Sequence, residues 1–223
     1  MLALIGGTSF RFADLPPLER ESVNTPFGPA EVLCGDYLML MRHQRGLPPH
    51  RINFRAGMAA LAIRGADRVV AFGCSGSLKK KIPPGSLVIP DDYLSWADIP
   101  SFHDHAISHV RPEIDPYLRT ELSRLVPEAI PRGVYAQTRG PRLETVAEVK
   151  ALARIADIVG MTLASEATLA REMDLHFAAL CTVDNYAHGL GNEVLTYEQV
   201  LESARVHGDR TAEIVLRIVE ALA

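Results

Sequence analysis

Residues able to bind an anion follow two apolar runs of strand length. The run 37–41 is followed directly by Arg42 and His43, and the run 2–5 by Gly6–Thr8. An arginine donates a bidentate pair of hydrogen bonds to phosphate oxygens, and glycines let the backbone approach an anion closely. Each segment alone is also typical of a charged strand end or an ordinary glycine turn. Together they predict a small-anion site.

Two further polar clusters follow the apolar runs 68–72 and 176–183. Gly73 and Cys74 begin the first cluster, where small residues permit close contact with a sugar or an anion. The second contains the pair Asp184–Asn185, which either reads the hydrogen-bonding edge of a ligand or caps a turn. Ligands of open α/β sheets bind beyond the carboxyl ends of the strands, so these clusters are expected to converge.

Acidic residues stand near two expected helix starts. Glu144 opens the helical segment 146–155, where the helix dipole favours a carboxylate, so a purely structural role is also possible for it. Glu166 comes four residues after Thr162 in the stretch that begins at Val159. The sequence contains no GxSxG, HExxH or P-loop motif, so serine-nucleophile and metalloprotease chemistry have no signature in it.

The elements that position these clusters alternate between strand and helix. Strands are expected at 2–5, 37–41, 68–72, 86–90, 133–138, 158–161 and 176–183. Helices are expected at 53–63, 118–125, 146–155, 165–173 and 196–222. Several strands are apolar throughout, as in sheets covered on both faces. We therefore predict an α/β fold: a three-layer α/β/α sandwich with a mostly mixed central sheet and a long loop at 91–116.

Composition is that of a single globular domain spanning residues 1–223. The net charge is −4, so there is no basic surplus for nucleic acid, and no apolar run is long enough to span a membrane. The apolar start, 1–5, is too short for a signal peptide. The cysteines Cys34, Cys74 and Cys181 form no CxxC motif, which predicts free thiols, no metal site and a cytoplasmic location.

In this order, the clusters resemble the trimeric purine nucleoside phosphorylase and methylthioadenosine phosphorylase family. The matching stretches are 5–8, 42–43, 49–56, 76–78 with 84–90, 140–145, 159–162 with Glu166, and 184–187. They cover nearly the whole chain. The resemblance implies the nucleoside phosphorylase fold and a reversible phosphorolysis. Nucleoside and phosphate give a free base and ribose 1-phosphate or its 5-methylthio analogue, with inorganic phosphate as co-substrate and no cofactor.

The resemblance also implies roles for particular residues. It assigns phosphate binding to Thr8, Arg42, His43, Gly73, Cys74 and Thr162. It assigns nucleoside binding to Leu143, Met161, Ala187 and His109, with His109 reaching the 5′ pocket of a neighbouring subunit. It assigns catalytic contacts with the base to Asn185 and Glu144. It further implies a homotrimer or a dimer of trimers. Ser9 and Gly57 depart from the usual family residues, which are glycine and asparagine.

The base preference follows from the same resemblance. Members acting on 6-aminopurines usually carry aspartate at the position of Asn185 and again at Ala187, whereas members acting on 6-oxopurines carry asparagine and a glutamate matching Glu144. We therefore expect 5′-methylthioinosine, inosine or guanosine as substrate, closest to the methylthioinosine phosphorylase branch. A shift of register that substitutes Asp184 would instead predict a 5′-methylthioadenosine phosphorylase. The same clusters would also suit a phosphate-independent nucleoside hydrolase or a non-catalytic purine-binding protein.

Overall fold

The computed structural model describes residues 1–191 and 197–223. Within them, ten strands form one mixed sheet. The strands are β1 (Leu2–Gly6), β2 (Glu19–Thr25), β3 (Gly28–Cys34), β4 (Leu38–Met41), β5 (Arg68–Ser77), β6 (Leu87–Val88), β7 (Asp92–Ser95), β8 (Val134–Gln137), β9 (Ile158–Gly160) and β10 (His176–Tyr186). The helices are α1 (Phe54–Ile63), α2 (Pro116–Leu125), α3 (Val146–Leu152), α4 (Leu163–Glu172), α5 (Tyr197–Val206) and α6 (Gly208–Leu222).

The strand order brings the predicted clusters to one edge of the sheet. The main path runs β2-β3-β4-β1-β5-β9-β8-β7, and β10 lies along β5 and also pairs with β6. Strands β4, β1, β5 and β10 are mutually parallel, so their carboxyl ends point in one direction. The polar residues at the carboxyl ends of these strands therefore meet at one end of the sheet, as expected for this class of fold.

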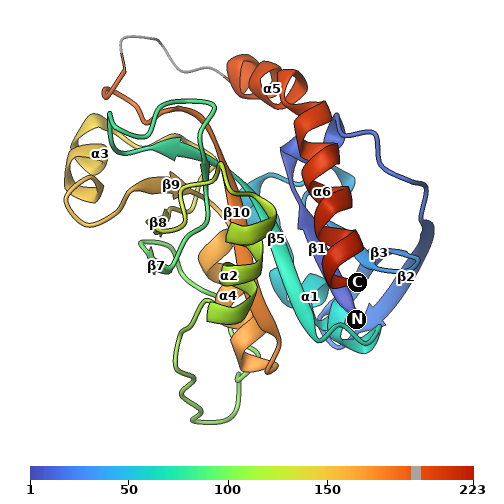
Figure 1. The fold of residues 1–223 in the computed structure, drawn as a ribbon. Helices are drawn as coiled ribbons and strands as arrows, with labels where there is room; N and C mark the ends of the chain where they lie inside the picture. Colours follow the sequence, from blue (N-terminus) through green and yellow to red (C-terminus); the bar gives the residue numbers. More distant parts are fainter. Residues whose placement is uncertain (192–196) are drawn as a thin grey trace.

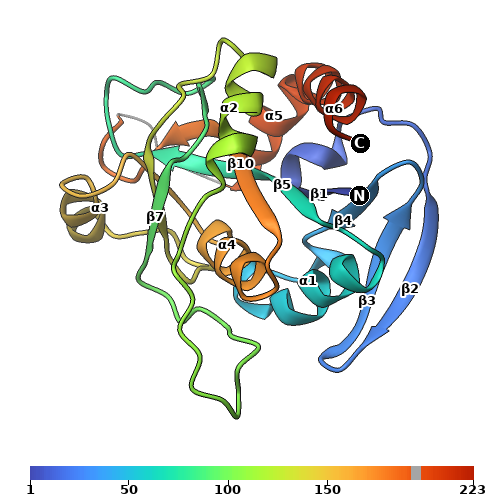
Figure 2. The same ribbon diagram turned by 60° about the horizontal axis from the view of Figure 1, so that its bottom comes forward.

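Helices cover both faces of the sheet. The alternation of side chains along β1 shows the two layers: Ala3 and Ile5 pack into the core beneath α1 and α4, whereas Leu2 and Leu4 pack towards α2 and α6. Figure 2 shows α1 and α4 on one side of the strands and α2, α5 and α6 on the other. The predicted α/β/α fold with a mixed sheet is confirmed. No described helix is both long and apolar enough to cross a membrane.

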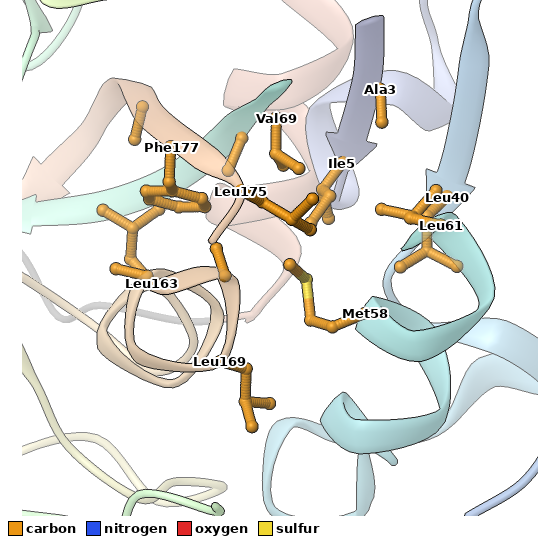
Figure 3. Packing of buried hydrophobic residues seen from close by; sticks show 14 of the residues in the cluster. Ala3, Ile5, Leu40, Met58, Leu61, Val69, Leu163, Leu169, Leu175 and Phe177 are labelled. Carbon is orange, nitrogen blue, oxygen red and sulfur yellow. The ribbon is translucent and has the colours of Figure 1, made fainter. Parts of the chain in front are cut away.

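The core between β1 and the helices α1 and α4 holds the site end of the sheet in place. In Figure 3, Ile5 of β1 points towards Met58 of α1, with Leu163 of α4 and Phe177 of β10 further along the same layer. Gly57 of α1 belongs to this contact, because a Cβ there would lie 2.9 Å from the nearest side-chain carbon of Leu40. This close packing explains why a small residue stands at position 57.

Local capping residues begin several of the helices. The Asn53 side chain accepts a hydrogen bond from the Ala56 amide at the start of α1, and Asp115 does the same for Leu118 in α2. Thr145 and Glu148 form a complete capping box at α3. These signals explain why the helices starting at 54, 116 and 146 could be predicted closely.

The structure differs from the prediction in several elements. The hairpin β2–β3 was not predicted, because its residues are mostly polar and only alternate positions are buried. Strand β7 lies within the predicted loop 91–116, whose last residue begins α2. The predicted helix 196–222 is two helices that break at His207, and residue 196 lies outside the described residues. A Cβ at Gly208 would meet the Phe12 carbonyl oxygen at 2.5 Å, so the backbone packs tightly where the second helix begins.

Candidate active site

A cavity of about 600 Å³ lies at the carboxyl ends of β1, β4, β5 and β10. This volume falls in the range of ~300–1,000 Å³ that is usual for small-molecule sites. The predicted residues in its wall are Thr8, Arg42, His43, Cys74, Leu143, Glu144, Met161, Thr162, Asn185 and Ala187. Residues separated by more than 170 positions along the chain thus share one site.

Arg42 is held rigidly by a buried ion pair. Its Nε and Nη2 donate to the two carboxylate oxygens of Glu166 at 2.5 and 2.9 Å, and its Nη1 donates to the Phe72 carbonyl at 3.0 Å. Both charged side chains are only 3% exposed. A Cβ at Gly7 would lie 2.6 Å from Arg42 Nη1, so a glycine is needed there. Burial lowers the pKa of Arg42, but Glu166, with smaller contributions from Tyr135 and Cys74, raises it overall, and the guanidinium stays charged.

The role of Glu166 was not predicted from the sequence, although the residue belongs to a matching stretch. Glu166 lies one turn after Thr162 on α4, so both residues share a helix face. That spacing is the one signal in the sequence that could have suggested a shared site. The partner, Arg42, is 124 residues away, and no local pattern connects the two.

His43 lies beside Arg42 with its ring orientation fixed. Its Nδ1 is 2.8 Å from the Leu47 carbonyl oxygen, and because a carbonyl only accepts, Nδ1 carries a proton. Burial lowers the pKa of His43; the Leu47 carbonyl opposes this, while the Arg42 charge lowers the pKa further. The neutral ring therefore presents an acceptor at Nε2. His43 becomes an additional donor to an anion only when it is protonated.

Thr8, Cys74 and Thr162 complete the same end of the cavity. Thr8 begins a short 3-10 helix after the Gly6–Gly7 turn, and Thr162 precedes the first residue of α4. The amides of Thr162 and Leu163 are near the Tyr135 hydroxyl, at 3.3 and 3.5 Å, so this residue of β8 orients the start of α4. Burial, with a contribution from Asp184, raises the pKa of the Cys74 thiol to about 12. The thiol is therefore neutral and a poor nucleophile.

Glu144 and Asn185 lie at another part of the wall, with Ala187. The buried Glu144 carboxylate accepts a hydrogen bond from Thr138 Oγ1 at 2.5 Å, and the Glu144 carbonyl is 3.0 Å from His188 Nδ1. Asn185 Nδ2 donates to the Tyr186 carbonyl at 2.8 Å, which orients its amide. A carboxylate and an amide are thus fixed by their neighbours and face the same cavity.

Leu143 and Met161 add apolar surface to this wall. Leu143 is 41% exposed, whereas Met161, between Gly160 and Thr162, is partly buried in the cavity wall. Met161 Sδ would be only 2.5 Å from a Cβ at Gly140, a residue with φ of +64°. Glycine at 140 therefore allows the loop 139–145 to close over the methionine.

Two predicted residues are not part of this cavity. Gly73 is buried one residue before Cys74, and its carbonyl accepts a hydrogen bond from Thr182 Oγ1 at 3.4 Å. His109 is exposed in the loop that follows β7. That loop packs on α1 and α4 through the Arg55–Asp104 ion pair and the Ser101–Glu172 hydrogen bond, and Figure 2 shows it projecting beyond these helices. The proposed reach of His109 into a neighbouring subunit stays a prediction.

Several wall residues were missing from the predicted set. Arg11 and Asp184 contribute charged groups, Ser75 a hydroxyl, and Leu47–Pro49 an apolar segment. Arg11 follows Thr8 by three residues, a spacing that could have suggested its inclusion. In residues 1–191 and 197–223, no three histidine, cysteine or acidic side chains are grouped to hold a metal ion.

Comparison with known proteins extends along the whole chain. The family model of the Phosphorylase superfamily matches residues 1–220. A probable 6-oxopurine nucleoside phosphorylase of Archaeoglobus fulgidus is 39% identical, and the match covers 99% of this chain and 96% of that protein. A probable S-methyl-5′-thioinosine phosphorylase of Methanocaldococcus jannaschii is 33% identical, with 96% and 90% covered.

The fold is likewise shared with a solved structure. A methylthioadenosine phosphorylase from Schistosoma mansoni, in complex with adenine, superposes with a TM-score of 0.91 at 24% identity. That superposition covers 99% of this chain and 91% of the other. The shared fold and the family match over residues 1–220 agree, and the chain belongs to the Phosphorylase superfamily.

Proposed function

We propose that this protein is a purine nucleoside phosphorylase, a pentosyltransferase that cleaves 6-oxopurine nucleosides with inorganic phosphate. The products are the free base and ribose 1-phosphate, or 5-methylthioribose 1-phosphate when the substrate is 5′-methylthioinosine. One observation carries the proposal: a single cavity joins an anion-binding set around Arg42 to the fixed pair of Glu144 and Asn185. The named activities of the Archaeoglobus and Methanocaldococcus relatives agree with this proposal.

The set around Arg42 supplies the phosphate site. Arg42, fixed by Glu166, offers its remaining guanidinium protons, and the hydroxyls of Thr8 and Thr162 add uncharged donors. A phosphate held there lies against the sugar and attacks C1′ as the bond to the base breaks. The cationic, oxocarbenium-like sugar is stabilised by the phosphate dianion, so the protein needs to supply position and charge rather than a nucleophile.

Glu144 and Asn185 read the base. A 6-oxopurine carries a proton on N1, which the Glu144 carboxylate can accept, whereas N1 of a 6-aminopurine bears a lone pair that a carboxylate repels. The Asn185 amide can donate to O6 or N7, where negative charge develops as the base leaves. Met161 provides an apolar contact for the sugar, and Leu143 flanks the base. The combination favours inosine-type substrates.

The proposed function is tested by following base release in a matched substrate panel. Inosine, guanosine and adenosine are compared with their 5′-methylthio forms, each with and without phosphate. We expect release that requires phosphate and is faster for the 6-oxopurines. Release that ignores phosphate would identify a hydrolase, tight binding without release a non-catalytic protein, and preference for methylthioadenosine the aminopurine branch.

Substitution of Asn185 by aspartate tests how the base is read. A carboxylate lacks the remaining amide proton that Asn185 would offer to O6 or N7, but it accepts a hydrogen bond from a 6-amino group. We expect Asn185→Asp to lower the inosine-to-adenosine ratio of kcat/KM by roughly 10- to 100-fold, the equivalent of one or two charge-sensitive hydrogen bonds. Asn24→Asp, at an exposed position of β2, is the matched control. An unchanged ratio in Asn185→Asp would contradict this role.

We further propose that the chain forms a homotrimer or a dimer of trimers, and that it acts in the cytoplasm. The exposed loop that carries His109 lies away from its own cavity, as a segment serving a neighbouring subunit would. Cys34, Cys74 and Cys181 are free thiols, which fits a reducing compartment. Sedimentation analysis tests the assembly: a monomer at assay concentration would contradict it.

A further inference from the structure

A β-bulge places an extra carboxylate in the cavity wall. Strand β10 pairs with β5 in regular register up to Val183 opposite Ser75, and pairing resumes with Asn185 opposite Gly76. Asp184 is therefore the extra residue of the bulge. Successive side chains of a regular strand point to opposite faces, but here Asp184 and Asn185 both line the cavity. The bulge thus adds an acidic group beside the amide proposed to contact the base.

The two residues face different parts of the wall. Asn185 lies beside Gly76, with its amide nitrogen 3.1 Å from the position of a Cβ there. Asp184 turns towards Thr182 and Cys74, and its Oδ1 accepts a hydrogen bond from Thr182 Oγ1 at 2.8 Å. The Cys74 thiol in turn interacts with the Ser9 amide in the turn that carries Thr8. Asp184 therefore lies at the anion-binding end of the cavity, not at the base.

The other oxygen of Asp184 is buried without compensation. Oδ2 is inaccessible to solvent and has no hydrogen-bond partner of regular geometry among the described residues. Burial raises the pKa of Asp184 to about 6, and the interactions with Thr182 and Cys74 oppose this only in part. An ionised carboxylate is thus poorly stabilised at this position.

No neighbouring cation in the described part of the chain compensates for that charge. The titratable groups around this end come from every adjoining element: Arg11, Arg42, His43, Cys74, Tyr135, Glu166 and Cys181. Arg42 is already paired with Glu166, burial keeps both thiols and the tyrosine neutral, and His43 has a lowered pKa. Arg11 is exposed. With Asp184 ionised, a phosphate dianion would meet an unneutralised negative charge beside its binding groups.

We propose that Asp184 couples anion binding to proton uptake: when a dianion occupies the Thr8–Cys74 end of the cavity, the Asp184 carboxylate takes one proton from solvent and becomes neutral. The proton returns to solvent when the anion leaves. This inference rests on the proposed function for the position of phosphate in the cavity. Asp184 then controls the affinity for the anion through its own charge, and it has no role in bond breaking.

Sulfate is the probe that tests this coupling, because it stays a dianion between about pH 5.5 and pH 8.5 and does not titrate as phosphate does. Titration calorimetry near pH 7.5, repeated in buffers with different heats of ionisation, counts the protons taken up on binding. We expect close to one proton per sulfate for the wild-type protein. We also expect the sulfate Kd to rise roughly tenfold for each pH unit above the pKa of Asp184.

The variant Asp184→Asn keeps the acceptor for Thr182 but cannot ionise. We expect it to take up no proton and to bind sulfate with a Kd nearly independent of pH, at least ~10-fold tighter than wild type near pH 8. Asp98→Asn controls for an exposed carboxylate outside the wall.

The outcomes of these experiments test the coupling by Asp184 separately from the phosphorylase function. Proton uptake that persists in Asp184→Asn, uptake near zero in the wild type, or absence of sulfate binding would overturn the coupling. Coupled sulfate binding in a protein that releases no base would overturn the phosphorylase function and leave the coupling in place. Phosphate-dependent base release without proton uptake on sulfate binding would support the phosphorylase function and overturn the coupling.

Discussion

At the scale of single residues, the chemistry of a side chain depends on its neighbours more than on its type. Arg42 is a charged residue at a strand end, a position that is usually exposed, yet it is buried and paired with Glu166. The sequence predicted the arginine because arginine suits phosphate. It singled out Glu166 beside Thr162 but did not predict the pairing with Arg42, since a carboxylate has no reason to lie near phosphate unless it positions a cation.

Removal of Glu166 tests this pairing. Glu166→Ala leaves Arg42 charged and buried without a partner, so we expect the free energy of unfolding to fall by about 3–5 kcal/mol. The double variant Arg42→Met with Glu166→Leu should recover most of that loss while phosphate dependence disappears. Denaturant unfolding measures the first effect and the phosphate KM the second. A loss below about 1 kcal/mol in Glu166→Ala, as for an exposed pair, would contradict a buried pair of this kind.

Asp184 gives the protein a stability that depends on pH. Its pKa is raised from 3.8 to about 6 on folding, so the folded state holds the proton more tightly than the unfolded chain. Stability is therefore greatest below about pH 4 for this group and is lost as pH rises to about 6. The gap between the two pKa values corresponds to about 3 kcal/mol. We expect Asp184→Asn to be more stable than wild type by up to that amount near pH 8.

Unfolding curves between about pH 5 and pH 8 measure this difference without any ligand. The gain in Asp184→Asn should be nearly constant above about pH 7 and shrink as the pH falls from about 6 towards 4, because folded wild-type Asp184 is then protonated and the unfolded chain approaches its own pKa of 3.8. A gain that stays constant with pH would mean that the substitution acts through packing instead of charge.

At the scale of elements, helix starts were predicted well and strand ends poorly. The caps Asn53, Asp115 and Thr145 act within four residues, so their sequence signals are sufficient. The clusters after residues 72 and 183 were expected to be loops, since glycine, serine, aspartate and asparagine disfavour strands. They instead continue β5 to Ser77 and β10 to Tyr186, because the two strands pair along their whole length. Local propensity could not show this pairing.

The capping box of α3 offers a prediction at this scale. Thr145 follows Glu144 directly, and its side chain accepts a hydrogen bond from the Glu148 amide. We expect Thr145→Ala to cost about 0.5–2 kcal/mol of stability and to raise the nucleoside KM more than the phosphate KM, because Glu144 loses its fixed position. Thr120→Ala, at an exposed position of α2, is the control. Equal effects on both KM values would show that α3 does not act through the part of the cavity wall that Glu144 and Asn185 form.

At the scale of the whole molecule, one sheet carries both the core and the site. Strands β1, β4, β5 and β10 end at the cavity, and the same strands bury their side chains against helices on both faces. Figure 1 shows α6 lying beside β1 while α3, β8 and β9 lie at the far end of the sheet. The geometry of the cavity is therefore maintained by packing some distance from it.

A pair of substitutions on α1 tests this dependence. Leu61 is fully buried against the sheet, whereas Ile63, two residues later, is 57% exposed. We expect Leu61→Ala to lower stability by about 2–5 kcal/mol, and Ile63→Ala to change it by less than about 0.5 kcal/mol. Thermal and denaturant unfolding measure both. Similar losses in the two variants would contradict the packing of α1 described above.

The sequence by itself predicted the class of fold, the apolar strands and the capped helices, because each depends on residue types within a few positions. The ten predicted residues that line the cavity were named from the family resemblance, and their roles stay predictions. The sequence also left open whether Asn185 or Asp184 is the residue that contacts the base. Only the tertiary structure showed that both line one cavity, through a bulge against β5, and that they face different ends of it. Only the tertiary structure showed the pairing of Arg42 with Glu166 as well. These features join residues more than a hundred positions apart, and local sequence patterns do not encode such contacts.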